Sequence, residues 1–204
     1  MQTLTTQKKK PKIQIIDNFL PTEIFDQFTH HAITSPHFVG VGHTAYTNEV
    51  YNDNFAELQM QAILFRRYTN SSEISDCYLR LESQIKKIHE LLKIKKLWLM
   101  RVNCTFGQKE GYQGAWHTDM NWTERLEKKG YTSIIYLNSN NGGTQFKNGP
   151  FIESKANRCV IAPMTAVHAG VWATNIKCRY VLNINYESYQ KFSKLKIKKI
   201  LKIF

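Results

Sequence analysis

The chain has 204 residues, of which 42% are hydrophobic and 12% are aromatic, and it carries a formal charge of +12 at pH 7. This length and composition suit one folded domain with a substantial core and exclude a disordered chain. The sequence has no apolar run of the ~18 residues that a membrane-spanning helix needs, and no apolar signal core. The four cysteines lack metal-site spacing, so we expect them to be reduced and the protein to be cytoplasmic.

The positive charge is concentrated at the two ends of the chain. Ten of the 28 Lys and Arg residues lie in these ends, which leaves 18 against 16 acidic residues in the body. We expect a flexible basic arm over 1–12, one domain over 13–189 and a basic amphipathic tail over 190–204. A basic nucleic-acid groove is not expected in the nearly neutral body. The tail either docks on its own domain or binds a membrane surface, an acidic partner or nucleic acid.

The first half of the body is expected to be mainly helical. The predicted elements are a strand at 13–16, a helix from Glu23 with Thr22 as N-cap, a loop with short extended pieces at 35–54, and helices at 55–67 and 72–95. Within the last of these, Leu81, Ile85, Ile88 and Leu92 have the spacing of one apolar helix face. The stretch 38–54 is either a lid over a site or a passive surface loop.

From residue 97 onward, short β-rich runs alternate with turn-forming stretches. The predicted strands are 97–106, 131–138, 157–162, 166–172 and 177–186. No helices alternate with them, which disfavours a parallel α/β sheet. We therefore predict a mainly β fold, an antiparallel sandwich or jelly roll with the N-terminal helices packed outside it.

The sequence Trp116-His117-Thr118-Asp119 contains an imidazole and a carboxylate two residues apart. In an extended segment these two side chains point to the same face, so both can bind one metal ion. His168 is the only histidine that follows this motif. Two His and one carboxylate form the facial triad of non-haem Fe(II) oxygenases. A hydrogen-bonded turn without metal is the alternative for the short motif alone.

Arg179 follows His168 by eleven residues and lies at the start of a predicted strand. A buried guanidinium is costly without an anion. Its planar fork suits a carboxylate, such as the distal carboxylate of a 2-oxo diacid.

An HxD motif, a distal His and an Arg on the final strand together resemble the 2-oxoglutarate/Fe(II)-dependent oxygenases, which have the double-stranded β-helix (jelly-roll, cupin-like) fold. The segment Ser133–Asn138 resembles the prolyl-4-hydroxylase-like branch. The sequence is similar to uncharacterised marine bacteriophage members of this branch, in the stretches 99–103, 136–144, 153–158 and 179–186. The resemblance covers about 13–186, with helical support over 13–96 and a β-helix core over 97–186. A phage-encoded protein of this kind would act in the cytoplasm of the host cell.

The resemblance implies a specific cofactor site. It implies Fe(II) bound by His117, Asp119 and His168, with 2-oxoglutarate and O₂ as cosubstrates and ascorbate as a candidate reductant. It also implies that Arg179 and Tyr136 hold the 2-oxoglutarate. Asn103 and Asn183 are candidate amide donors to it, and for each a structural strand hydrogen bond is the alternative. Val181 stands where relatives often have Ser or Thr, which removes one expected contact.

The expected reaction is hydroxylation of an unactivated C–H bond with release of succinate and CO₂. The substrate is expected to be a protein side chain, as for prolyl hydroxylases, or a small metabolite. Trp116 and Trp122 either line a substrate entrance or pack in the core, and Arg101 meets either substrate or an acidic side chain. The alternatives are a nucleic-acid-modifying oxygenase and a non-catalytic β-sandwich module with a vestigial metal site. The first is disfavoured because no second Arg follows Arg179.

Overall fold

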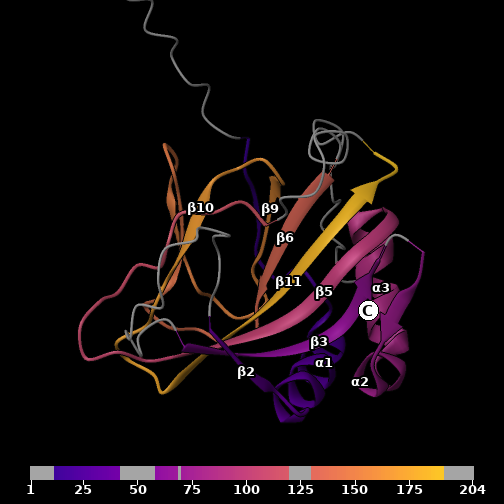
Figure 1. Cartoon of the computed structure of the whole chain (residues 1–204), viewed down its shortest axis with the longest axis horizontal. Helices are drawn as coiled ribbons and strands as arrows, with labels where there is room; N and C mark the ends of the chain where they lie inside the picture. Colours follow the sequence, from indigo (N-terminus) through magenta and orange to yellow (C-terminus); the bar gives the residue numbers. More distant parts are fainter. Residues whose placement is uncertain (1–11, 42–57, 69, 120–129, 191–204) are drawn as a thin grey trace, which may run out of the picture.

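The computed structural model describes residues 12–41, 58–68, 70–119 and 130–190 (Figure 1). The helices are α1 (Thr22–Thr34), α2 (Asp76–Arg80) and α3 (Glu82–Leu92). The strands are β1 (Gln14–Ile16), β2 (Phe38–Val41), β3 (Leu58–Arg67), β4 (Ser72–Ile74), β5 (Ile94–Phe106), β6 (Gly130–Tyr136), β7 (Gly143–Phe146), β8 (Phe151–Glu153), β9 (Cys159–Pro163), β10 (His168–Val171) and β11 (Cys178–Ser188).

The strands form two antiparallel sheets. The large sheet has the order β1-β9-β6-β11-β5-β3-β2, with β4 paired to β3, and the small sheet has the order β10-β7-β8. Figure 1 shows the small sheet on the left, the large sheet in the centre, and the three helices on the right and below it. This arrangement confirms the predicted fold class, a double-stranded β-helix with flanking N-terminal helices.

Apolar side chains cover both faces of the large sheet. The cluster between this sheet and the helices includes Phe28, Leu64, Ile88, Met100 and Leu182. The cluster between the two sheets includes Ile134, Tyr136, Phe146, Ile152 and Val160. Burial of each large apolar side chain contributes about 1.5–3 kcal/mol, so these two layers stabilise the sandwich that holds the site.

The predicted apolar face of the last helix is confirmed, since all four of its residues are buried. The element boundaries around it differ from the prediction. The expected helix at 72–95 is divided into β4, α2 and α3. Ser75 caps α2 by accepting a 3.2 Å hydrogen bond from the Tyr78 N–H, and Lys93 ends α3 in the left-handed conformation with φ 54°. Ser75 thus begins α2 after β4, and Lys93 ends α3, at positions where the local pattern alone suggested one continuous helix.

The helix predicted at 55–67 is wrong where the structure describes it, because β3 occupies Leu58–Arg67. This strand lies between β2 and β5 in the large sheet, so pairing with distant strands overrides its helical propensity. The N-cap prediction is also wrong, since α1 begins at Thr22 and Pro21 is its cap residue. The Pro21 carbonyl accepts the Phe25 N–H at 2.9 Å.

Some sequence-based expectations concern segments that lie outside the described residues. These are most of the N-terminal arm, the 42–54 part of the suggested lid, Trp122 and the 191–204 tail. All four cysteines are free thiols. None of the described helices is long and apolar enough to cross a membrane.

Candidate metal centre and adjoining pocket

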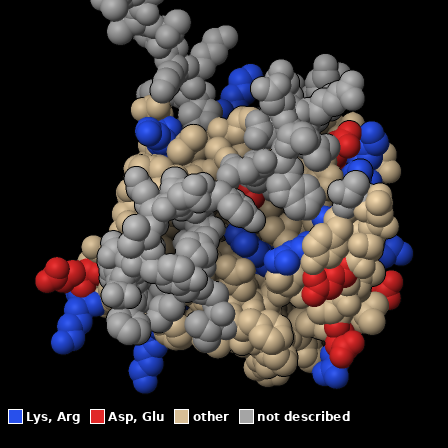
Figure 2. Space-filling view, viewed as in Figure 1, with Lys and Arg blue, Asp and Glu red and all other residues tan. Residues whose placement is uncertain are grey.

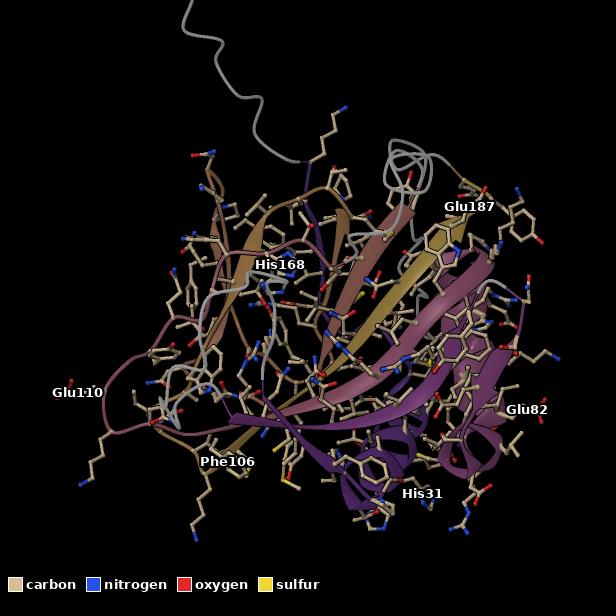
Figure 3. The ribbon with its side chains drawn as sticks, in the orientation of Figure 1. His31, Glu82, Phe106, Glu110, His168 and Glu187 are labelled. Atoms are coloured by element: carbon tan, nitrogen blue, oxygen red, sulfur yellow. The ribbon has the colours of Figure 1, made fainter. Side chains whose placement is uncertain are left out.

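A backbone bridge places the two predicted metal-binding histidines side by side. His117 and His168 form an isolated antiparallel bridge, with N–H to O=C distances of 2.9 Å in both directions. Their ring centroids are 4.5 Å apart. Figure 3 shows His168 in the space between the small and large sheets. The bridge therefore brings residues 51 positions apart in sequence into one site.

Asp119 completes a compact group of three potential metal ligands. One ligand atom from each of His117, Asp119 and His168 lies within 4.8 Å of the other two. The Asp119 Oδ1 atom is 3.9 Å from His117 Nε2 and 3.7 Å from His168 Nε2. These separations suit donors that surround one small cation. The described residues thus supply the two-His, one-carboxylate set that non-haem Fe(II) uses.

The outer ring nitrogen of each histidine faces a backbone carbonyl. His117 Nδ1 lies 3.0 Å from the Ala115 oxygen, and His168 Nδ1 lies 3.0 Å from the Ala166 oxygen. A protonated Nδ1 donates to that oxygen, which leaves the Nε2 lone pair directed toward Asp119. Such bonds fix the tautomer and the ring orientation of metal-binding histidines. Burial lowers the pKa of His117, the nearby His168 lowers it further, and the neutral form that metals bind is therefore favoured.

Three side chains of the large sheet orient the Asp119 carboxylate. Thr132 Oγ1 donates to Oδ2 at 2.6 Å, and the side-chain amides of Asn183 and Asn185 donate to the same atom at 3.2 Å. Burial raises the pKa of Asp119, but the histidines and the Thr132 hydrogen bond outweigh it and lower this pKa to about 2. Asp119 is therefore an ionised carboxylate. Its Oδ1 faces the two histidines and also accepts from the Asn183 amide at 3.2 Å.

Sequence reasoning did not identify Thr132 and Asn185. They lie opposite each other on β6 and β11, where the residues register as partners. Asn185 is completely buried on β11, between Ile184 and Tyr186, and occupies the same strand face as Arg179 and Asn183. Such a buried polar residue, two positions beyond another, was the available sequence signal.

The triad opens into a pocket between the sheets. Its wall on β11 includes Arg179, Val181 and Asn183, and its wall on β5 includes Arg101, Asn103 and Thr105. Alternate residues of a strand face one side, so each wall presents every second side chain. The register pairs these walls row by row, as Arg179 with Thr105, Val181 with Asn103, and Asn183 with Arg101.

Unsatisfied polar atoms converge on this pocket. Five of the nine buried side-chain atoms that lack a partner among the described residues belong to its lining: Arg101 Nε, Asn103 Oδ1, Thr105 Oγ1, Trp172 Nε1 and Asn183 Oδ1. Buried donors and acceptors without partners are costly. A polar ligand would satisfy them, so the residues present fit a metal ion together with a polar organic molecule.

Arg179 occupies the end of the pocket away from Asn183. It is 5% exposed, its Nε donates to Ser154 Oγ at 2.9 Å and one Nη2 N–H donates to the Gly143 carbonyl at 3.0 Å. Burial lowers the pKa of this guanidinium. No acidic side chain among the described residues forms an ion pair with it. The guanidinium N–H groups that these partners leave unused can bind an anionic ligand.

The other predicted cosubstrate contacts differ in their surroundings. Tyr136 is fully buried under Arg179, whose guanidinium carbon lies 5.5 Å from the ring centroid. The Tyr136 hydroxyl hydrogen-bonds to the Thr144 hydroxyl at 2.9 Å and to the Ile152 carbonyl at 3.1 Å. Asn183 directs its amide N–H groups at Asp119, whereas Asn103 faces the pocket. Their roles toward a cosubstrate stay predictions.

Comparison with known proteins identifies the fold. No protein-family model and no curated protein matches the sequence. A prolyl hydroxylase from Trichoplax adhaerens, solved with a peptide of hypoxia inducible factor, superposes with a TM-score of 0.58 at 16% identity, covering 86% of this chain and 83% of that one. An oxidoreductase of the 2OG-Fe(II) oxygenase family from Burkholderia pseudomallei gives 0.61 at 6% identity, covering 85% and 84%.

A third similar structure is SnoN, a non-heme α-ketoglutarate-dependent epimerase from nogalamycin biosynthesis. Its TM-score is 0.58 at 12% identity, and the match covers 87% of this chain and 79% of that one. The similarity to bacteriophage proteins stays a prediction. At these identities the comparisons establish architecture, and this chain shares the double-stranded β-helix fold of 2-oxoglutarate/Fe(II) oxygenases.

Proposed function

We propose that this protein is an Fe(II)- and 2-oxoglutarate-dependent dioxygenase that hydroxylates an unactivated C–H bond and releases succinate and CO₂. The observation that carries the proposal is the convergence of two histidine Nε2 atoms and an ionised carboxylate beside a buried Arg179 that forms no ion pair with a described acidic side chain. Under this proposal His117, Asp119 and His168 hold the iron. The bound iron and cosubstrate, with O₂, supply the oxidising chemistry.

The protein side chains have distinct tasks in this proposal. The Ala115 and Ala166 carbonyls keep the histidine rings oriented, and Thr132 with the two asparagines keeps Asp119 oriented. Arg179 binds the distal carboxylate of 2-oxoglutarate through its free N–H groups. Tyr136 packs against Arg179 and limits where its guanidinium can lie. Asn103 and Thr105 then meet polar atoms along the cosubstrate.

Apolar side chains complete the pocket wall. Ile134 and Val181 lie among the polar lining residues, and both are at least 94% buried. Such walls exclude bulk water and strengthen the electrostatic interactions of Arg179 and Asp119. The substrate of the proposed reaction is a protein side chain, by analogy with prolyl hydroxylases, or a small metabolite.

The proposal is tested by metal-dependent turnover of 2-oxoglutarate without a prime substrate. We expect the Fe(II)-loaded protein to bind 2-oxoglutarate without oxygen, with a visible charge-transfer absorption, and to release succinate slowly when oxygen is admitted. Asp119→Ala should lose both signals, whereas a distant carboxylate variant, Glu90→Ala, should retain them. Absence of metal-dependent 2-oxoglutarate binding would contradict the proposal and favour the non-catalytic alternative.

A further inference from the structure

The pocket contains a second cation, Arg101, at the opposite end from Arg179. On the paired strands β5 and β11, Arg101 is opposite Asn183, and Thr105 is opposite Arg179. These rows are four residues apart along each strand, which corresponds to about 13 Å. Asn183 also holds the Asp119 carboxylate, so Arg101 lies at the metal end of the pocket. One arginine therefore flanks each end.

Arg101 has no partner among the residues that the structure describes. No hydrogen bond and no ion pair involves its guanidinium, and its Nε is a buried atom without an acceptor. Burial lowers the pKa of Arg101, and the charge of Asp119 opposes this effect from beyond ion-pair distance. Arg179, in contrast, donates to Ser154 and Gly143. Arg101 is half-buried, and its Nε is a buried donor without an acceptor. Leaving such a donor unpaired is costly, which indicates that a ligand completes the site.

Arg66 on β3 extends the positive charge outward from Arg101. Burial is the main cause of the lowered pKa of Arg101, and the positive charge of Arg66 lowers it further. Arg66 likewise forms no ion pair with any described acidic side chain. Figure 2 shows basic side chains in the hollow at the centre of the displayed face, over β5 and β11. Two basic side chains thus lie near the metal end of the pocket, with Asp119 acting on Arg101 and Glu73 opposite Arg66 on β4.

The charge within the pocket also distinguishes between candidate ligands. A divalent metal contributes two positive charges, Arg101 and Arg179 one each, and Asp119 one negative charge, with both histidines neutral. The 2-oxoglutarate dianion offsets two of the resulting three positive charges. One positive charge remains, and it lies at the Arg101 end because Arg179 is matched by the distal carboxylate. A neutral peptide segment would leave this charge unpaired.

We propose that Arg101 binds the carboxylate of a small carboxylic acid, and that this acid is the molecule oxidised at the metal. The inference rests on the proposed function and specifies its substrate class. A guanidinium binds a carboxylate through two parallel N–H···O bonds, so Arg101 fixes both the position and the orientation of the substrate. Arg101 is thereby a specificity-determining residue, distinct from the cosubstrate anchor Arg179.

The test compares free acids with their own carboxamides. The full-length protein is loaded with Zn²⁺, which has no redox chemistry, and with 2-oxoglutarate. Thermal shift and calorimetry then measure binding of the amino acids and their N-acetyl derivatives, each as acid and as carboxamide. We expect at least one acid to bind while its amide does not. Arg101→Met should weaken the binding of that acid roughly 10- to 100-fold, as expected for the loss of a pair of charge-assisted hydrogen bonds. Arg101→Lys should weaken the binding less.

Two measurements separate the possible sources of the bound carboxylate. Arg101→Met should retain wild-type affinity for 2-oxoglutarate, whereas Arg179→Met should lose that affinity. The control variant Arg80→Met, at an exposed position, should bind both 2-oxoglutarate and the acid as the wild type does. If Arg101→Met lost as much affinity for 2-oxoglutarate as Arg179→Met, the proposal would be overturned, because Arg101 would then hold the cosubstrate.

The acid and amide comparison on the wild-type protein does not depend on any variant folding. Absence of an acid preference, or a preference that survives Arg101→Met, would also overturn the proposal. An Arg101-dependent acid preference in a protein that fails to bind 2-oxoglutarate would support the carboxylate site while refuting the proposed function.

Discussion

Replacing Thr132 with Val removes a hydrogen-bond donor from Asp119 while preserving side-chain shape. The Thr132 hydroxyl donates to Asp119 Oδ2 at 2.6 Å and accepts from Asn185 Nδ2 at 2.8 Å, so the change affects both partners. A hydrogen bond to a charged group contributes about 1.5–3 kcal/mol. Its loss moves the pKa of Asp119 upward from about 2. We expect the affinity for Zn²⁺ or Fe(II) to fall about 10- to 100-fold, as is usual for outer-sphere partners of metal ligands.

Isothermal titration of the metal-free protein at neutral pH measures this effect directly. Thr132→Ser restores the hydroxyl and should recover most of the affinity. Thr29→Val is the matched control, because its Oγ1 is also buried but lies on α1 and has no partner among the described residues. Equal metal affinities for wild type and Thr132→Val would refute the inference that this hydroxyl orients the carboxylate.

Three further predictions concern the anion site, a surface ion pair and a close backbone approach. Arg179→Met should raise the Kd for 2-oxoglutarate about 100-fold in calorimetry, with metal affinity unchanged. Asp17→Asn should destabilise the protein by about 1 kcal/mol at pH 7, because the Arg158 hydrogen bond lowers the pKa of Asp17 from 3.8 to about 2, while 38% exposure allows solvent screening. The folded-state pKa is depressed, so denaturation at a series of pH values should show this contribution above about pH 4 and lose it as the pH falls toward 2. Gly107→Ala should cost about 1–3 kcal/mol, because its Cβ would overlap a backbone carbonyl, whereas Gly111→Ala, with open space around it, should be near neutral in the same denaturation assay.

The β-rich half of the chain was predictable because its signals are local. Alternation within each run and turn residues between runs indicate strands, and the two-residue spacing of His117 and Asp119 indicates a shared face. The spacing from His168 to Arg179 added a second cue. These patterns do not depend on contacts with distant parts of the chain. The structure accordingly contains β5, β6, β9, β10 and β11 where strands were expected.

The missed features depend on contacts that the local sequence does not reveal. In β3 a bulge between Ile63 and Phe65 interrupts the alternation, and the strand is held by pairing with β5 about 40 residues later. The bulge places Leu64 and Phe65 together in the core, which resembles a helical apolar pattern. Thr132 and Asn185 were missed for a related reason, since their common partner Asp119 is distant from Asn185 in sequence.

The histidine bridge also has a mechanical consequence for the whole sandwich. His168 begins β10 of the small sheet, whereas the side chains that fix Asp119 all belong to the large sheet. A metal ion held by these residues would therefore connect the two sheets, and its binding affinity would depend on the distance between them. Phe146 of β7 is buried between the sheets, and its ring centroid lies 5.6 Å from that of His168. Replacing Phe146 with a smaller side chain should therefore weaken metal binding, because the distance between the sheets would change while all three candidate ligands remain.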